Sequence, residues 1–231
     1  MINFKTLIPL ILQRVMWIPT RLIFNFFVHL NVVGVEKAEG LNSPIIISSN
    51  HASELDPIIV AASLPFFSKR FPLMYTSREK GFYSNSGIRQ IFYGGALFKA
   101  VGAYSVEVGK QDYSKSLATH REFLNKGFSL CIFPEGGITQ DGKFKEFKGG
   151  VSYLAESTGF PVIPVLITGN FNISLKDFLF RKRSVKVVFG DPVYVKRPND
   201  LVGSLVEFYK IEAKSIRSMT SQLSEYPQDF I

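Results

Sequence analysis

Residues 44–57 have the sequence PIIISSNHASELDP, and this stretch indicates the architecture of the chain. It begins with a short run of β-branched apolar residues, which is typical of a buried strand. A polar turn follows, and Asp56 then precedes Pro57, an order in which aspartate can cap a helix and proline is favoured at the first helical position. The stretch therefore predicts a strand that ends at Ser49, a turn, and a helix that begins near Asp56.

The same alternation of short apolar runs and longer helical patterns continues through the rest of the chain. Helical patterns cover residues 112–126, 149–158 and 200–223, and the first two are followed by Gly127 and Gly159. Strands that alternate with helices are typical of an α/β protein. We therefore expect an α/β fold in which a mixed central sheet is flanked by helices. The expected strands cover residues 44–49, 71–76, 103–108, 128–133, 161–168 and 184–189.

The length of 231 residues predicts one domain, because a chain of this size builds one hydrophobic core. Hydrophobic residues make up 46% of the chain and include 22 phenylalanines, which indicates that some apolar surface faces something other than water. The formal net charge of +8 indicates attraction to a polyanion, such as nucleic acid, an anionic bilayer or a phosphorylated substrate. The single cysteine, Cys131, excludes an intramolecular disulfide and a cysteine metal cluster.

Residues 4–30 are strongly apolar, but arginines and prolines divide them into pieces shorter than a membrane-spanning helix requires. On a helix, Arg14, Arg21 and Asn25 fall on one narrow face while apolar residues occupy the remainder. This pattern predicts a pair of helices, divided at Pro19, that lies in the membrane interface with its cations near the lipid phosphates. The alternative is a pair of core helices packed on the main domain. We divide the chain into a membrane-associating helical segment (1–34), a main domain (35–224) and a loose tail (225–231).

His51 directly follows the first predicted strand, and Asp56 lies five residues later across the turn. Ligands of such sheets bind beyond the carboxyl ends of the strands. A carboxylate on one imidazole nitrogen fixes the tautomer and leaves the other nitrogen able to take a proton from a substrate hydroxyl, which is then the nucleophile. The alternative is that His51 only ends a strand and Asp56 only caps a helix. The other histidines, His29 and His120, are expected to be solvated or packed.

Residues 128–137 have the sequence FSLCIFPEGG, in which a second predicted strand is again followed by a turn. Gly136 and Gly137 allow main-chain N–H groups to approach an anion closely. Glu135, at the tip of the strand, is expected to orient an acceptor hydroxyl or a cation. The alternative is an ordinary glycine turn followed by solvated lysines, which are Lys143, Lys145 and Lys148.

Together the two motifs resemble those of the glycerolipid acyltransferase family, whose best-known members acylate lysophosphatidate. His51 and Asp56 meet the family pattern H-x4-D, and residues 133–136 meet its F-P-E-G block. The resemblance implies that His51 is the general base, that Asp56 is its partner, and that the donor is acyl-coenzyme A or acyl carrier protein. It implies no cofactor, no metal and no covalent acyl-enzyme, and it implies N-terminal helices that dip into the membrane. It extends over residues 36–195, with further blocks at 147–150 and 162–165.

The departures from the family pattern fall on positions that bind phosphate. Where family members often carry an arginine in a second block, residues 102–110 offer only Lys110. The third block commonly continues with threonine and arginine, where this chain has Gly137 and Ile138. Lysine lacks the two-pronged fit of arginine to phosphate, so the acceptor is a 1-acyl-glycerol-3-phosphate-like lyso-lipid or, alternatively, a lipid without phosphate. The substrate-binding candidates are Asn50, Glu135, Gly136, Gly137, Lys110, Lys143 and Lys148.

Other functional classes leave parts of the sequence unexplained. The chain has no G-x-S-x-G, G-x-G-x-x-G or G-x4-G-K-[ST] motif, so a serine hydrolase, a Rossmann site and a P-loop lack their sequence basis. Nucleic-acid binding explains the charge but neither motif. The remaining rival is a non-catalytic lipid- or membrane-binding protein. We therefore expect an O-acyltransferase of phospholipid synthesis or remodelling that acts on a lyso-lipid at the cytoplasmic face of a membrane, without a cofactor or a nucleic-acid partner.

Overall fold

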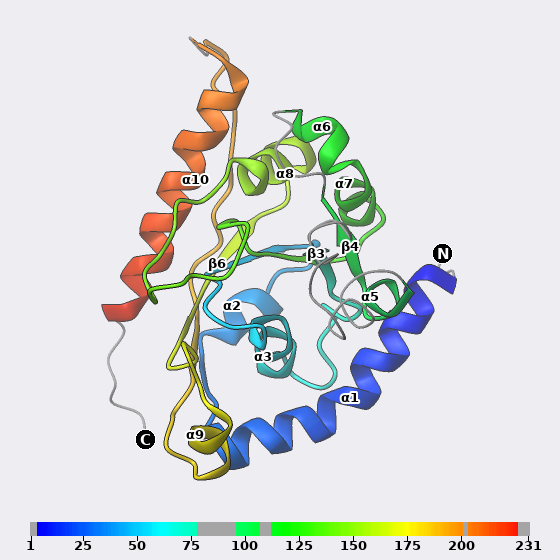
Figure 1. Cartoon of the computed structure of the whole chain (residues 1–231). Helices are drawn as coiled ribbons and strands as arrows, with labels where there is room; N and C mark the ends of the chain where they lie inside the picture. The colour runs from blue at the N-terminus through cyan, green and yellow to red at the C-terminus, as the bar shows by residue number, and fades with distance from the viewer. Residues whose placement is uncertain (1–3, 78–95, 107–111, 201–202, 226–231) are drawn as a thin grey trace.

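The central sheet is the feature that positions every other element (Figure 1). The computed structural model describes residues 4–77, 96–106, 112–200 and 203–225, and within these ranges seven strands form one sheet in the order β1-β7-β6-β2-β5-β3-β4. β6 and β7 pair antiparallel and the other neighbours pair parallel, so the prediction of a mixed sheet is confirmed. The strands are β1 (Asn31–Val33), β2 (Ile46–Ser49), β3 (Met74–Ser77), β4 (Ala103–Ser105), β5 (Leu130–Ile132), β6 (Val162–Thr168) and β7 (Lys186–Phe189).

Six of these strands lie within or overlap the predicted ranges, whereas β1 was not predicted. Residues 31–33 belong to the segment that we expected to be helical, but they pair with β7 at one edge of the sheet. The helices between the strands are α1 (Phe4–Val28), α2 (Val35–Glu39), α3 (Asp56–Ser63), α5 (Ala96–Ala100), α6 (Tyr113–Ser116), α7 (Ala118–Asn125), α8 (Gly150–Thr158), α9 (Leu175–Leu179) and α10 (Leu205–Gln222), with a 3-10 turn at Leu223–Glu225.

Alternation of side chains along β2 gives the sheet two buried faces. Ile45 and Ile47 pack into one hydrophobic core with residues of α1 and α3, whereas Ile46 packs into a second core with residues of α7, α8 and α10. Successive residues of a strand point to opposite faces, so a continuous isoleucine run suits a strand that is covered on both sides. Figure 1 shows the resulting layers, with α1 along one side of the sheet and α10 along another.

The predicted helix over residues 112–126 is interrupted. Its predicted start is confirmed, since the Asp112 carboxylate caps α6 by accepting hydrogen bonds from the main-chain N–H groups of Ser114 and Lys115. The chain leaves helical geometry at Leu117 (φ −112°), and α7 then begins at Ala118. The later helices agree with the predicted ranges, because α8 ends at the left-handed Gly159 and α10 lies within 200–223.

The N-terminal segment forms one helix, so the prediction of two helices divided at Pro19 is wrong. α1 runs from Phe4 to Val28 with Pro9 and Pro19 inside it. Each proline removes one hydrogen bond from the helix ladder, and packing of the helix against the protein offsets that loss. Among the described residues, α1 is the only helix that is long and apolar enough to cross a membrane by length and composition.

α1 turns Arg14, Trp17 and Arg21 toward the protein, whereas Asn25 is exposed. We expected Arg14 and Arg21 to lie near lipid phosphates, but the Arg14 guanidinium donates to the carbonyl of Ser68 (3.0 Å) and Arg21 donates to that of Ala62 (2.7 Å). The indole N–H of Trp17 donates to a third carbonyl of the same region. The helix also exposes apolar side chains, which are Leu7, Ile8, Ile11, Val15, Met16, Ile18, Leu22, Ile23 and Phe26.

Candidate active site

His51 and Asp56 lie together at the carboxyl end of β2, as their spacing predicted. His51 Nδ1 is 2.9 Å from Asp56 Oδ2. No described residue forms a hydrogen bond with Nε2, and the side chain lines a large cavity. The His51 ring stacks on Phe133 at the tip of β5, with 4.4 Å between the ring centroids. The imidazole is therefore held by a carboxylate from the start of α3 and by an aromatic ring from the tip of β5.

The Asp56 carboxylate is fully buried and accepts hydrogen bonds at both oxygens. Besides the His51 ring, Oδ2 accepts from the main-chain N–H groups of Ala52 (2.7 Å) and Ser53 (2.9 Å). Oδ1 accepts from the side-chain amide of Asn170. Although α3 begins at Asp56, the carboxylate bonds backward to the turn instead of capping the helix as expected. The four donors satisfy both oxygens of this buried side chain and fix its orientation.

Two asparagines connect this pair to β6. Asn50 uses both ends of its amide on the main chain of Ile167, accepting at 2.8 Å and donating at 2.9 Å. Asn50 does not line the cavity, which does not fit our expectation of a substrate contact. Its two hydrogen bonds instead support the turn that carries His51. Asn170, which holds Asp56, was not predicted. Its sequence signal was its place two residues after the predicted strand 161–168.

Glu135 joins the two motifs through their main chains. Its Oε1 accepts from the N–H of His51 (2.9 Å) and its Oε2 from the N–H of Lys145 (3.1 Å). Burial raises the pKa of the Glu135 carboxyl above its ordinary value, and the two N–H donors oppose this shift. We expected Glu135 to orient an acceptor hydroxyl, but both oxygens are committed to the protein and the residue does not line the cavity. It is a positioning residue.

The glycine turn after β5 brings a lysine to the cavity. Gly136 has a φ of +71°, and a Cβ there would lie 2.5 Å from Lys148 Nζ. Gly137 and Lys148 line the cavity with it, whereas Lys143 is exposed outside it. The sequence reasoning missed the two lysines that α10 adds, and Lys110 lies outside the described residues. The four lysines of the cavity wall are Lys145, Lys148, Lys210 and Lys214.

The cavity has a volume of about 1670 Å³ and is mostly apolar. α1 contributes Met16 and Trp17 to its wall, α3 contributes Ile58, and α10 contributes Lys210 and Lys214. A long hydrocarbon chain and an anionic group can therefore be held in the same space as His51.

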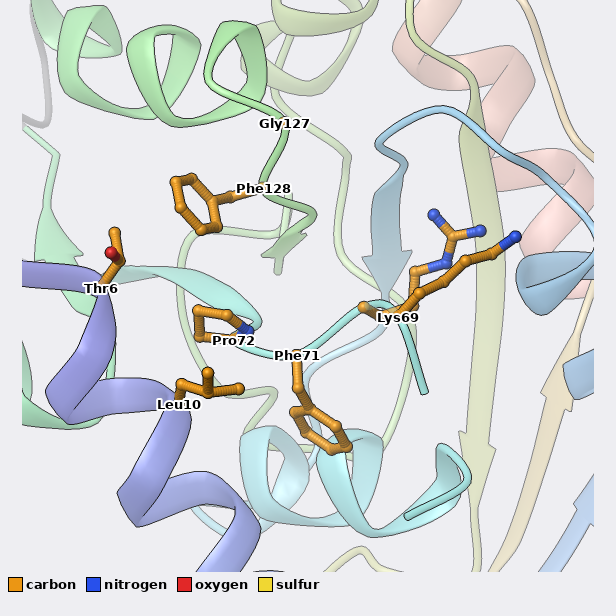
Figure 2. A pocket seen from close by; sticks show the side chains of 8 residues that line it. Thr6, Leu10, Lys69, Phe71, Pro72, Gly127 and Phe128 are labelled. Atoms are coloured by element: carbon orange, nitrogen blue, oxygen red, sulfur yellow. The ribbon is translucent and has the colours of Figure 1, made fainter. Parts of the chain in front are cut away.

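A second hollow of about 150 Å³ lies beside the amino-terminal half of α1 and contains no motif residue. Figure 2 shows Thr6 and Leu10 of α1 on one side of it and Pro72 and Phe128 on the other. Neither of the other histidines lines the large cavity, since His120 is buried elsewhere and His29 is exposed. Within the described ranges, no group of three histidine, cysteine or acidic residues is arranged to hold a metal ion.

Comparison with known proteins agrees with this geometry. The chloroplastic 1-acyl-sn-glycerol-3-phosphate acyltransferase BAT2 of Brassica napus is 26% identical over 171 residues, which are 73% of this chain and 46% of that protein. A probable 1-acyl-sn-glycerol-3-phosphate acyltransferase of Mycoplasma pneumoniae is 20% identical over 221 residues, 90% of this chain and 76% of that protein. This chain spans about half the length of the plant relatives that it matches, 46% and 44%.

The fold also resembles a solved structure. The crystal structure of the 1-acyl-sn-glycerophosphate acyltransferase PlsC from Thermotoga maritima superposes with a TM-score of 0.61 at 17% identity, over 95% of this chain and 83% of that chain. A family model described as Acyltransferase matches residues 29–168, which contain both motifs and most of the sheet. Because this match covers more than half of the 231 residues, the chain belongs to the acyltransferase family.

Proposed function

We propose that this protein is an O-acyltransferase that moves a fatty acyl group from a thioester donor to a hydroxyl of a lyso-glycerolipid. The single observation that carries the proposal is the His51–Asp56 pair, with Nδ1 bound at 2.9 Å and the ring in the wall of a large apolar cavity. A non-catalytic lipid-binding protein needs the cavity but has no physical need for an imidazole oriented by a buried carboxylate.

His51 acts as the general base in this proposal. Because the Asp56 carboxylate only accepts hydrogen bonds, it favours the tautomer with the proton on Nδ1 and the lone pair on Nε2. Nε2 takes the proton of the acceptor hydroxyl while its oxygen attacks the thioester carbonyl. The carbon–sulfur bond then breaks, and Nε2 returns the proton to the leaving thiolate. Main-chain groups of the turn at Gly137, which lines the same cavity, stabilise the negative oxygen of the intermediate.

The acceptor that fits best is a 1-acyl-glycerol-3-phosphate-like lipid. The names of the relatives support this choice, as does the placement of Lys148 and Lys214 in the wall of the cavity that contains His51. Lysines supply charge but no bidentate fit, so an acceptor without phosphate is the second candidate. Acyl-coenzyme A or acyl carrier protein is the donor, and the reaction requires no cofactor. We place the enzyme at the cytoplasmic face of a phospholipid-synthesising membrane, with the apolar face of α1 toward the bilayer.

The test is transfer of labelled palmitoyl from coenzyme A or carrier protein to a panel of lyso-lipids with and without phosphate. We expect product with wild-type protein and none above background with His51→Ala, because Nε2 supplies the only base in the mechanism. His51→Ala should bind vesicles as wild type does. Equal transfer by His51→Ala would refute the mechanism, and vesicle binding without product from any pair would favour the non-catalytic alternative.

A further inference from the structure

Residues 179–183 are the last residue of α9 and the four residues after it. They expose apolar and basic side chains beside the carboxyl-terminal end of α1. Leu179 is 53% exposed and Phe180 is 71% exposed. Arg181 and Lys182, which follow them, are exposed as well. Figure 1 shows α9 next to the end of α1, and the two helices are in contact. The segment 179–183 therefore extends the exposed apolar surface of α1 and adds cations to it.

The segment is fixed to α1 and is not a loose tip. The ring of Phe178 stacks on that of Phe27, with centroids 5.0 Å apart. The Arg181 guanidinium lies 4.6 Å from the ring centroid of Phe26, an exposed residue of the apolar face of α1. At the other end of α9, Ser174 and Asp177 form a capping box that fixes where the helix begins. The exposed side chains consequently have a defined position relative to α1.

Arg181 occupies a backbone position that favours glycine. Its φ is +55°, and the two main-chain hydrogen bonds of a Schellman motif surround it, from Arg181 N to Phe178 O (3.2 Å) and from Lys182 N to Asp177 O (3.0 Å). Glycine adopts this left-handed conformation without the steric cost that a side chain brings. The guanidinium of Arg181 contacts the Phe26 ring and lies 3.4 Å from His29 Nε2, contacts that glycine lacks.

We propose that residues 179–183 form a second membrane contact, which docks beside α1 on an anionic phospholipid bilayer. This inference rests on the proposed function, because it assigns the surface through which the enzyme reaches its lipid. Leu179 and Phe180 enter the interface next to Phe26, and Arg181 and Lys182 bind lipid phosphates. An aromatic and aliphatic tip flanked by cations is complementary to a bilayer surface, whose interior is apolar and whose headgroups are negative.

The test is binding of the full chain to vesicles of phosphatidylcholine with and without phosphatidylglycerol. Arg181→Gly removes the cation and relieves the backbone, so we expect an unchanged or raised Tm together with about fivefold weaker binding to anionic vesicles. Phe180→Ser should weaken binding to both kinds of vesicle. The matched controls are Lys196→Gln and Tyr194→Ser, two exposed residues away from the segment, which should bind as wild type does.

Two results would overturn the inference. One is wild-type affinity of Arg181→Gly for anionic vesicles. The other is an equal loss in Arg181→Gly and Lys196→Gln, which would mean that only the overall charge matters. Failure of the proposed function has a different outcome, namely absence of His51-dependent transfer while the segment variants still lose vesicle binding.

Discussion

Two buried carboxylates support the same histidine in different ways. Asp56 contacts the imidazole ring directly, whereas Glu135 binds the main-chain N–H of His51 and that of Lys145. The first contact selects the tautomer, and the second fixes the distance between the two motif turns. A hydrogen bond to a charged acceptor in a buried place is strong, because water does not compete for it. The position of His51 therefore depends on both motifs.

Replacing Glu135 with glutamine tests this positioning role. Glutamine retains one acceptor oxygen but turns an NH2 group toward the other N–H, so one of the two main-chain donors is left unpaired. We expect kcat to fall about tenfold with KM nearly unchanged, because the base is displaced and the cavity is not altered. Steady-state kinetics with Glu122→Gln, an exposed glutamate, as the control will measure this. An unchanged kcat would contradict the role.

At the scale of an element, α1 has the reverse of the usual polarity of a surface helix. Gln13 accepts from the N–H of Leu73 (2.8 Å) and donates to the carbonyls of Leu73 (2.8 Å) and Val101 (2.9 Å). Leu73 and Val101 lie just before β3 and β4, outside the strands. Gln13 of α1 supplies hydrogen bonds to their main-chain groups. The apolar face remains outside. Such a helix suits a protein whose outer surface meets lipid.

Two substitutions on α1 compare how much each face of the helix contributes to the stability of the fold. Gln13→Leu leaves the buried N–H of Leu73 unpaired, so we expect the free energy of unfolding to fall by about 2 kcal/mol. Ile18→Ser changes a side chain on the outer face that is 51% exposed, and we expect a change within about 0.5 kcal/mol. Denaturant unfolding in the absence of lipid measures both values. Comparable losses in the two variants would mean that the outer face also packs on protein.

At the scale of the whole molecule, a buried histidine makes stability depend on pH. His120 of α7 is fully buried, and its Nε2 lies 3.1 Å from the carbonyl oxygen of Tyr104 in β4. Burial lowers the pKa of His120 from 6.5 to about 4, because the imidazolium loses its hydration. The unfolded chain therefore binds a proton that the folded chain excludes between these two pH values.

Stability should accordingly fall as pH decreases through this window. Relative to pH 7.5, we expect His120 to lower the free energy of unfolding by about 2 kcal/mol at pH 5. His120→Gln retains a donor for the Tyr104 carbonyl but does not titrate, so its stability should fall less over the same range. Urea unfolding of both proteins at the two pH values gives the comparison. Parallel pH profiles would show that His120 does not control the dependence.

The local parts of the fold and of the site could be predicted from the sequence. The β2 strand was evident from its isoleucine run, and five residues across a strand-to-helix turn suffice to bring Asp56 to His51. Contacts between distant segments could not be predicted, because the sheet order decides which strand tips meet. Asn170 is 114 residues from Asp56 in sequence, and Lys214 reaches the cavity wall from the last helix. β1 is three residues long, which is too short for a periodic pattern.

The long-range bonds of Asn50 and Asn170 have a consequence for the order of events during synthesis. Asn50 binds Ile167 across 117 residues and Asn170 binds Asp56 across 114, so the turn that carries His51 gains these two supports only after β6 has left the ribosome. α1 is translated first, although the main-chain groups that Gln13 and Trp17 contact lie 47 to 88 residues later in the sequence. A nascent chain that ends before Val162 therefore contains both motifs but neither of these two long-range contacts. Under the proposed function, the apolar face of α1 is therefore synthesised before the contacts around His51 are complete.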